Sequence, residues 1–308
     1  MRYDKEYDGN QGGFRFKEIP EGDFINTKES LCIPPLTSIS ELFFASQKIE
    51  KSEEQNLLPD KKWLAQLIHP GTSLGGARPK ASVIDEKKNL YVAKFPSRKD
   101  DYDVGLWEHF CHLLAIQAGI NAATTQTIAT DGKRHTLLSR RFDRNEEGKR
   151  IHFASAMTLL GLTDGDNACT GHGYLDIVDF IIQSCTDVEA NLQELYRRVA
   201  FYICIGNTDD HFRNHGFLLI PKGWILSPAY DINPTLNEQQ NLLISASSCE
   251  SDLNILLDAC EDYMINKEIA TKIIHEVREA VKGWRTLATK LGIAKREIGL
   301  FTQKFDRI

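Results

Sequence analysis

Two short stretches decide the fold of this chain, NTDDHFRN at residues 207–214 and AYDI at residues 229–232. They place an aspartate (Asp209), an asparagine five residues later (Asn214) and, beyond an expected hairpin, a second aspartate (Asp231). An aspartate can orient and deprotonate a hydroxyl group, and carboxylate and amide oxygens suit Mg²⁺. The two stretches therefore supply the groups that would hold a substrate hydroxyl beside Mg-ATP. The alternative is structural, because Asn and Asp are common turn and cap residues.

The order of these groups is that of a protein kinase. There, a loop aspartate accepts the hydroxyl proton, a loop asparagine binds metal, and a later aspartate binds the metal that bridges the phosphates. By this analogy Asp209 is the candidate catalytic residue, and Asn214 and Asp231 are the candidate Mg²⁺ ligands. Neither an HRD nor a DFG triplet is present, so the match is one of chemistry and order.

A glycine-rich stretch, GTSLGGARPK at residues 71–80, comes earlier in the chain and leads into an apolar run. Glycines let the backbone approach a phosphate closely and present N–H groups to it. The stretch fits neither GxGxxG nor the Walker pattern GxxxxGK[ST], so a plain turn is the alternative interpretation.

A lysine, Lys94, follows inside the strand-like segment LYVAKFP at residues 90–96. A buried ammonium group needs a partner, and Glu108 on an expected helix at residues 103–118 would supply one. The alternative is an edge-strand lysine that points to water. Glycine loop, strand lysine, helix glutamate, loop Asp/Asn and metal aspartate stand in the order that the two lobes of a kinase require.

With these motifs the chain resembles the HipA-like toxin kinases. The resemblance covers roughly residue 67 to the C-terminus. What precedes it is shorter than the N-terminal subdomain of full-length members, so the chain resembles the short, HipT-type toxins. Two residues depart from the family pattern: Asp210 stands where glycine is usual, and Arg140 stands where many members have glutamate. The matching residues are SLGGARPK at 73–80, AKFP at 93–96, Glu108, RFDR at 141–144, Thr208, Asp209, His211, Asn214 and YDI at 230–232.

This resemblance implies a serine/threonine kinase that phosphorylates a host protein, an aminoacyl-tRNA synthetase, and thereby arrests growth. It implies ATP and Mg²⁺ as cofactors, and HipB-like and HipS-like antitoxin proteins as partners. It also implies autophosphorylation of the glycine-rich stretch at Ser73, with Thr72 as a second acceptor. The implied ATP-binding residues are Ser73, Leu74, Gly75, Gly76, Ala77, Lys80, Lys94, Glu108, Arg140, Arg141, Phe142, His211 and Tyr230.

The expected fold is α+β, a bilobal protein-kinase-like (HipA-like) fold with a small mixed β-rich N-lobe and a larger helical C-lobe. We expect an N-terminal segment at residues 1–66 that packs on the N-lobe, the N-lobe with its glycine-rich loop at 67–142, and the C-lobe with the catalytic loop at 143–308. Residues 52–59 are expected to form a solvated connector. Strands are expected near 14–16, in hairpins at 80–95 and 123–141, and at 216–220 and 224–226; helices are expected at 40–50, 103–118, 155–160, 174–184, 188–205, 252–260, 267–284, 286–291 and 295–305.

Composition agrees with a cytoplasmic enzyme. A chain of 308 residues is longer than one hydrophobic core comfortably serves. With 37 Lys and Arg against 43 Asp and Glu, the formal charge of -6 argues against direct DNA binding. No apolar run has the length of a membrane span, and the first residues lack a signal-peptide core. The seven scattered cysteines favour reduced thiols; Cys111 and Cys204 are expected in the core.

Two rival functions use the same residues. The first is a small-molecule phosphotransferase, which would share the phosphate chemistry. The second is a catalytically weak kinase-fold binding module. The joint presence of Lys94, Asp209, Asn214 and Asp231 argues against the second, because degenerate kinases usually lose at least one of these groups.

Overall fold

The computed structural model describes residues 11–14, 17, 19–22, 33–58, 67 and 78–307. The glycine-rich residues 71–77 and most of the strand expected at 14–16 lie outside the described residues. The chain forms two compact units, residues 1–106 with 124–152 and residues 107–123 with 153–308. The first holds an antiparallel sheet and the second is mostly helical, so the predicted α+β class is confirmed.

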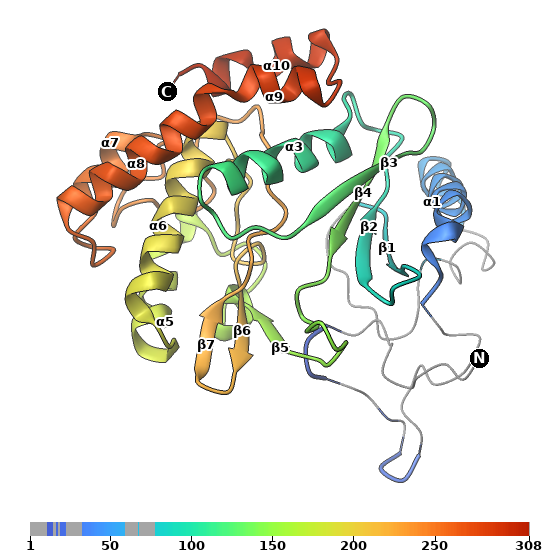
Figure 1. The fold of residues 1–308 in the computed structure, drawn as a ribbon, viewed down its shortest axis with the longest axis horizontal. Helices are drawn as coiled ribbons and strands as arrows, with labels where there is room; N and C mark the ends of the chain where they lie inside the picture. Colours follow the sequence, from blue (N-terminus) through green and yellow to red (C-terminus); the bar gives the residue numbers. More distant parts are fainter. Residues whose placement is uncertain are drawn as a thin grey trace. The chain divides into compact units, whose positions relative to one another are not determined.

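The first unit is built on a four-stranded antiparallel sheet in the order β1-β2-β4-β3 (Figure 1). Both predicted hairpins are present, because each turn has residues that stabilise it. In the β3–β4 turn the Asp131 carboxylate accepts hydrogen bonds from the amides of Lys133 (3.0 Å) and Arg134 (2.8 Å), and Gly132 adopts a left-handed φ of 76°. The strands are β1 (Lys80–Ile84), β2 (Leu90–Lys94), β3 (Thr125–Ala129) and β4 (His135–Arg140).

Helix α1 (Ile39–Glu54) packs on this sheet through Ile39 and Leu42, which recur at helical spacing and join a buried cluster with Val83 and Phe95. The helix extends beyond the predicted end at residue 50, so the connector expected to begin at residue 52 was placed too early. Its last turn is held because two glutamates at i, i+4 spacing accept hydrogen bonds from the segment after β2.

In the second unit, helix α6 lies at the centre and packs against α5, α7, α8 and α10. Its C-terminal half, from Val199 to Ile205, is buried throughout, which explains its nearly continuous apolar sequence. A three-stranded sheet in the order β5-β6-β7 completes this unit. Strand β5 was not predicted, because its four residues are too few to show a period. The elements are β5 (His152–Ser155), α4 (Ala156–Leu159), α5 (Tyr174–Ser184), α6 (Val188–Ile205), β6 (Gly216–Ile220), β7 (Gly223–Leu226), α7 (Leu253–Asp258), α8 (Lys267–Lys282), α9 (Trp284–Lys290) and α10 (Lys295–Phe305), with short 3-10 helices at Leu36–Ser38 and Ala168–Thr170.

Helix α3 (Val104–Gln117) belongs to the second unit from Trp107 onward, whereas the boundary expected at residue 142 counts it with the first lobe. The Trp107 ring lies 4.6 Å from that of Phe301 on α10, and its Nε1 donates to Glu297 at 3.0 Å. Aromatic packing therefore holds α3 beside α10, as Figure 1 also shows.

Two further expectations concern the described residues. Cys111 and Cys204 are buried and form no disulfide, as predicted. Of the helices described, none combines the length and the apolar character that a membrane crossing requires.

Candidate active site

The loop that carries Asp209 is set by the end of helix α6. Gly206 has a left-handed φ of 69°, and the amides of Gly206 and Asn207 donate to the carbonyls of Ile203 (3.3 Å) and Tyr202 (2.9 Å). This is a Schellman cap, in which glycine is favoured because a side chain is strained at that φ. The chain therefore leaves the central helix in a fixed direction and enters the 207–214 loop.

A second segment, residues 227–235, is held against this loop. Arg198 on α6, which is 1 % exposed, donates to the carbonyl of Ser227 at 2.8 Å. The Tyr230 hydroxyl donates to the carbonyl of Arg213 at 2.6 Å, and the Thr235 amide donates to that of Gly206 at 2.9 Å. The second unit thus brings together the predicted residues Asp209, His211, Asn214, Tyr230 and Asp231.

The electrostatics of Asp209 are unusual for a solvent-exposed aspartate. Partial burial by the packed loop raises its pKa, and the negative charges of Asp231 and Asp210 raise it further, while His211 opposes this. A carboxylate with a raised pKa is a stronger base than an ordinary aspartate, and such groups are enriched at catalytic sites.

Several buried polar atoms of the 207–214 loop, of the adjoining His215 and of the 227–235 segment have no hydrogen-bond partner within the described part of the chain. Buried polar groups are nearly always satisfied, so each exception needs an explanation such as a ligand or ion. The atoms are Asn207 Nδ2, Asp210 Oδ1, His211 Nδ1, His215 Nδ1 and Asn233 Oδ1.

The residues present fit a magnesium ion that also contacts phosphates. Mg²⁺ is typically held by one or two carboxylates together with waters and phosphate oxygens, not by an all-protein cage. The described residues contain no group of three or more His, Cys, Asp or Glu that could hold a metal ion. Asp231 has a left-handed φ of 57°, and its Oδ1 accepts from Asn233 Nδ2 at 3.1 Å, so its carboxylate is oriented. The assignment of Asn214 and Asp231 as ligands stays a prediction.

Sequence reasoning missed a buried network next to the catalytic loop. Asp210 is 1 % exposed, and its Oδ2 accepts from the Tyr174 hydroxyl at 2.7 Å and pairs with His215 Nε2 at 2.6 Å. Asp210 was noted only as a departure from glycine; its structural reason is that its side chain turns inward and ties the loop to α5. Because Asp210 follows Asp209 and His215 follows Asn214, the network anchors both ends of the loop.

In the first unit, Lys80 and Lys94 are opposite residues in the antiparallel β1–β2 pair. Arg140 is exposed and donates to Asn89 at 2.8 Å. The Arg141 amide donates to the Leu90 carbonyl at 2.8 Å, so this amide is committed to the sheet. Phe142 is half-buried. Their predicted contacts with ATP remain predictions, as do those of residues 73–77, which lie outside the described residues.

Glu108 lies in the second unit on α3 and is 2 % exposed. Its carboxylate is 3.9 Å from Nε2 of His112 one turn later. The other ring nitrogen of His112, Nδ1, lies 3.1 Å from the Ala123 carbonyl. A glutamate this deeply buried needs polar partners, which agrees with a positioning role more than with a surface one.

Two solved structures share this architecture. Shewanella oneidensis HipA, solved in a complex with HipB and its operator DNA, aligns with a TM-score of 0.63 at 16% identity, over 85% of this chain and 68% of that chain. The Helicobacter pylori proinflammatory kinase CtkA aligns with a TM-score of 0.51 at 16% identity, over 78% of this chain and 94% of that chain. The predicted fold, the kinase-like fold of HipA, is confirmed.

The family follows from the sequence. Residues 72–284, more than half of the chain, match the HipA-like C-terminal domain, so the chain belongs to that family. It is 26% identical over 214 residues to the serine/threonine-protein kinase toxin HipA of Shewanella oneidensis, covering 61% of this chain and 48% of that protein. The chain spans about half the length of the curated relatives it matches. The resemblance to HipA-like proteins is confirmed, whereas the short HipT type is not tested.

Proposed function

We propose that this protein is an ATP-dependent serine/threonine kinase and the toxin of a HipBST-type toxin–antitoxin system. The observation that carries the proposal is geometric: hydrogen bonds join the segment that bears Asp231 to the loop that bears Asp209, through Tyr230 to the Arg213 carbonyl and through Thr235 to the Gly206 carbonyl. Membership of the HipA-like C-terminal domain family and the likeness to a serine/threonine kinase toxin support it.

The reaction assigns a role to each group. The hydroxyl oxygen of a Ser or Thr attacks the γ-phosphorus of ATP, the bond from that phosphorus to the bridging oxygen breaks, and ADP leaves. Asp209 orients the hydroxyl and accepts its proton. Asn214 and Asp231 would hold Mg²⁺, which supplies positive charge to the phosphates when bound. Lys94 contacts the phosphates, and Glu108 positions it.

The finer parts of the proposal follow from the family. The substrate is a host protein, an aminoacyl-tRNA synthetase, whose phosphorylation arrests growth in the cytoplasm. The partners are HipB-like and HipS-like antitoxin proteins, and contact with DNA is left to the antitoxin; in support, the HipA relative was solved together with HipB and operator DNA. Autophosphorylation at Ser73, or at Thr72, would place roughly -1.5 to -2 charge beside the ATP phosphates and lower nucleotide affinity.

One experiment tests the central claim. Purified protein is incubated with ATP labelled on the γ-phosphate in a bacterial host lysate, and the labelled protein is identified by mass spectrometry. Asp209→Asn should lower transfer by about 10²- to 10⁴-fold with a smaller loss of nucleotide binding. Asp231→Ala should abolish transfer and also weaken binding of Mg-ATP. Equal metal-dependent nucleotide binding by wild type and Asp231→Ala would contradict the metal assignment.

Three further readouts separate the rival functions and test the autophosphorylation. Consumption of ATP only with a metabolite acceptor would identify a small-molecule phosphotransferase. Growth arrest that persists in Lys94→Ala and Asp209→Asn would point to a binding module. Intact mass after incubation with Mg-ATP tests the autophosphorylation, because a Thr72→Ala, Ser73→Ala double variant should gain no phosphate.

A further inference from the structure

Near the end of the glycine-rich stretch, Arg78 forms an ion pair with Asp100 that no sequence pattern predicts. Arg78 donates from Nη1 to Oδ2 of Asp100 at 2.8 Å and from Nη2 to Oδ1 at 2.5 Å. The Asp100 side chain is 6% exposed and that of Arg78 is 27% exposed. Two parallel hydrogen bonds between a guanidinium and a carboxylate fix the orientation of both groups, and such pairs are stronger than single contacts.

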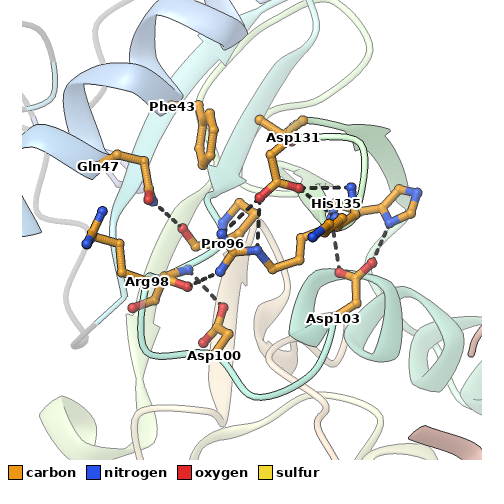
Figure 2. Close-up of polar contacts among 12 residues, drawn as sticks. Phe43, Gln47, Pro96, Arg98, Asp100, Asp103, Asp131 and His135 are labelled. Atoms are coloured by element: carbon orange, nitrogen blue, oxygen red, sulfur yellow. Dashed lines mark hydrogen bonds and ion pairs between the residues drawn. The ribbon is translucent and has the colours of Figure 1, made fainter. Parts of the chain in front are cut away.

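Asp100 is itself held in place. It lies in the segment 96–103 that follows β2, and its Oδ2 also accepts from the Ser97 amide at 2.8 Å. The Ser97 carbonyl accepts from Arg134, whose guanidinium also binds Asp131 in the β3–β4 turn at 2.9 and 3.0 Å. Figure 2 shows these contacts, with Asp100, Asp103, Asp131 and His135 around the segment.

Helix α1 holds the same segment from another direction. Glu50 accepts from the Ser97 hydroxyl at 2.6 Å and from the Arg98 amide at 2.9 Å. Gln47 donates to the Pro96 carbonyl at 2.9 Å (Figure 2). The carboxylate that receives Arg78 is therefore attached to α1 and to the β3–β4 turn. Both of these elements belong to the first unit.

The backbone next to Arg78 is fixed as well. The Phe95 amide donates to the Pro79 carbonyl at 2.9 Å, and Lys80 begins β1 opposite Lys94. Arg78 thus stands at the point where the glycine-rich stretch enters the sheet, two residues before a lysine assigned to ATP. With its charge balanced by Asp100 and two of its N–H groups bound to that carboxylate, Arg78 is suited to anchor the stretch.

We propose that the Arg78–Asp100 ion pair is a positioning device that fixes residues 78–80, through which the glycine-rich stretch enters strand β1, for the phosphates of ATP. The proposal rests on the proposed function, because it concerns the affinity of the same nucleotide site. Asp100 acts through Arg78 and touches no reacting atom. In the alternative hypothesis, Arg78 binds a phosphate of ATP directly and Asp100 has no effect on nucleotide binding.

A double-mutant cycle distinguishes these two hypotheses. Asp100→Asn removes the ion pair but keeps an oxygen that can accept from the Ser97 amide. If the pair acts as a unit, Asp100→Asn and Arg78→Gln should each raise the KM for ATP about three- to tenfold with kcat nearly unchanged, and the double variant should be no worse than the poorer single variant. Arg78→Lys should be intermediate, because lysine keeps the charge but loses the two-bond geometry.

The outcome that overturns the proposal is equally specific. If Arg78 binds phosphate directly, Asp100→Asn should leave the KM for ATP unchanged, while Arg78→Gln raises it. Arg98→Ala is the matched control, because Arg98 lies in the same segment but its side chain pairs with the exposed Glu54 and not with Asp100. Its KM should equal that of the wild type.

A second measurement keeps the test independent of kinase activity. Hydrogen exchange of peptides covering residues 71–80 is followed in nucleotide-free wild type, Asp100→Asn and Arg98→Ala. Faster exchange in Asp100→Asn alone supports the anchor, and equal exchange in all three overturns it. If wild type shows the anchored exchange pattern but neither binds nor consumes ATP, the proposed function fails while the anchor stands.

Discussion

Asp143 and Asp209 are both aspartates in motif loops, one in each unit, and their surroundings are opposite. Asp143 is 4% exposed, and burial alone would raise its pKa. The charges of Arg141 and Arg144 and the Gly12 amide outweigh burial, so the pKa of Asp143 is lowered. Asp209 is exposed, yet partial burial and the charges of Asp231 and Asp210 raise its pKa.

This difference in surroundings distinguishes an aspartate that stabilises the fold from one that is suited to catalysis. A buried charge that is paired and hydrogen-bonded holds elements together, as Asp143 does for the Gly12 amide at 2.7 Å. A carboxylate crowded by like charges stores unfavourable energy that a bound cation or proton relieves. We therefore expect substitution of Asp143 to act on stability, and substitution of Asp209 to act on activity.

The largest expected effect on stability comes from Asp143→Asn. It leaves two guanidinium groups, with side chains 4% and 6% exposed, without their carboxylate. Removal of one partner of a buried pair typically costs about 3–5 kcal/mol. Urea unfolding at pH 7 measures the free energy, with Asp306→Asn, which removes the charge from an exposed pair with Arg285, as the control. A loss below about 1 kcal/mol for Asp143→Asn would contradict the conclusion that Asp143 stabilises the fold.

The pH dependence of this difference has a definite sign. The folded pKa of Asp143 lies below its ordinary value, so the stabilisation is fully present above about pH 4, the range of an unperturbed aspartate. It is lost as the pH falls through the lowered folded pKa. The gap in unfolding free energy between wild type and Asp143→Asn should therefore shrink on acidification below about pH 4.

The local elements were predictable because each has a strong period or turn signal. The limits of α5, α6 and α10 agree with the sequence patterns, and both hairpins turn at the expected polar residues. For Asp209, Asn214 and Asp231, the sequence predicts only the order of these groups along the chain. Their shared position in space depends on Arg198 and Tyr230, whose contacts a pattern does not contain.

The contacts that position the site were not predictable, since they join residues far apart in the sequence. The Tyr174 hydroxyl is 36 residues from Asp210, and Arg78 is 22 residues from Asp100. His215 is buried, but its neighbours Arg213, Asn214 and Gly216 give no sign of this in the sequence. Nothing in the sequence identifies Asp210 as its partner.

Asp210→Asn should have the next largest effect, and it tests whether the second unit also uses a paired, structural aspartate. The variant keeps an oxygen for the Tyr174 hydroxyl but replaces the charge beside His215 with an amide. We expect a loss of about 1–3 kcal/mol in unfolding free energy, the range for disturbing a buried charged hydrogen bond. Because the loop is anchored at both ends, kcat should fall while the KM for ATP changes little.

Calorimetry and steady-state kinetics on the same preparation test this expectation. Asp179→Asn is the matched control, because Asp179 lies on the same helix α5 as Tyr174 but is exposed. Unchanged stability and kcat in Asp210→Asn would show that the inward-facing carboxylate does not hold the loop.

A smaller effect, of opposite sign, is expected for the stability of Asp209→Asn. The folded pKa of Asp209 is raised, so its ionised form is disfavoured in the folded state and lowers stability as the pH rises through that pKa. Asn carries no charge, so the variant should be more stable than wild type at pH 7, by less than about 1 kcal/mol because the side chain is solvent-exposed. Melting temperatures at pH 7 and pH 4 measure it, and the gain should fade at the lower pH, where wild type becomes protonated.

The smallest expected change in unfolding free energy is that of Arg98→Ala, because its charged pair is exposed. Arg98 and Glu54 form a pair whose side chains are 42% and 37% exposed, with both contacts at 3.3 Å. Exposed pairs of this kind contribute little, because water and salt screen the charges and two long side chains lose freedom. The unfolding free energy should change by less than about 0.5 kcal/mol, and the change should vanish in 1 M salt. A loss as large as that of Asp143→Asn would mean that burial does not decide which charged pairs hold this protein together.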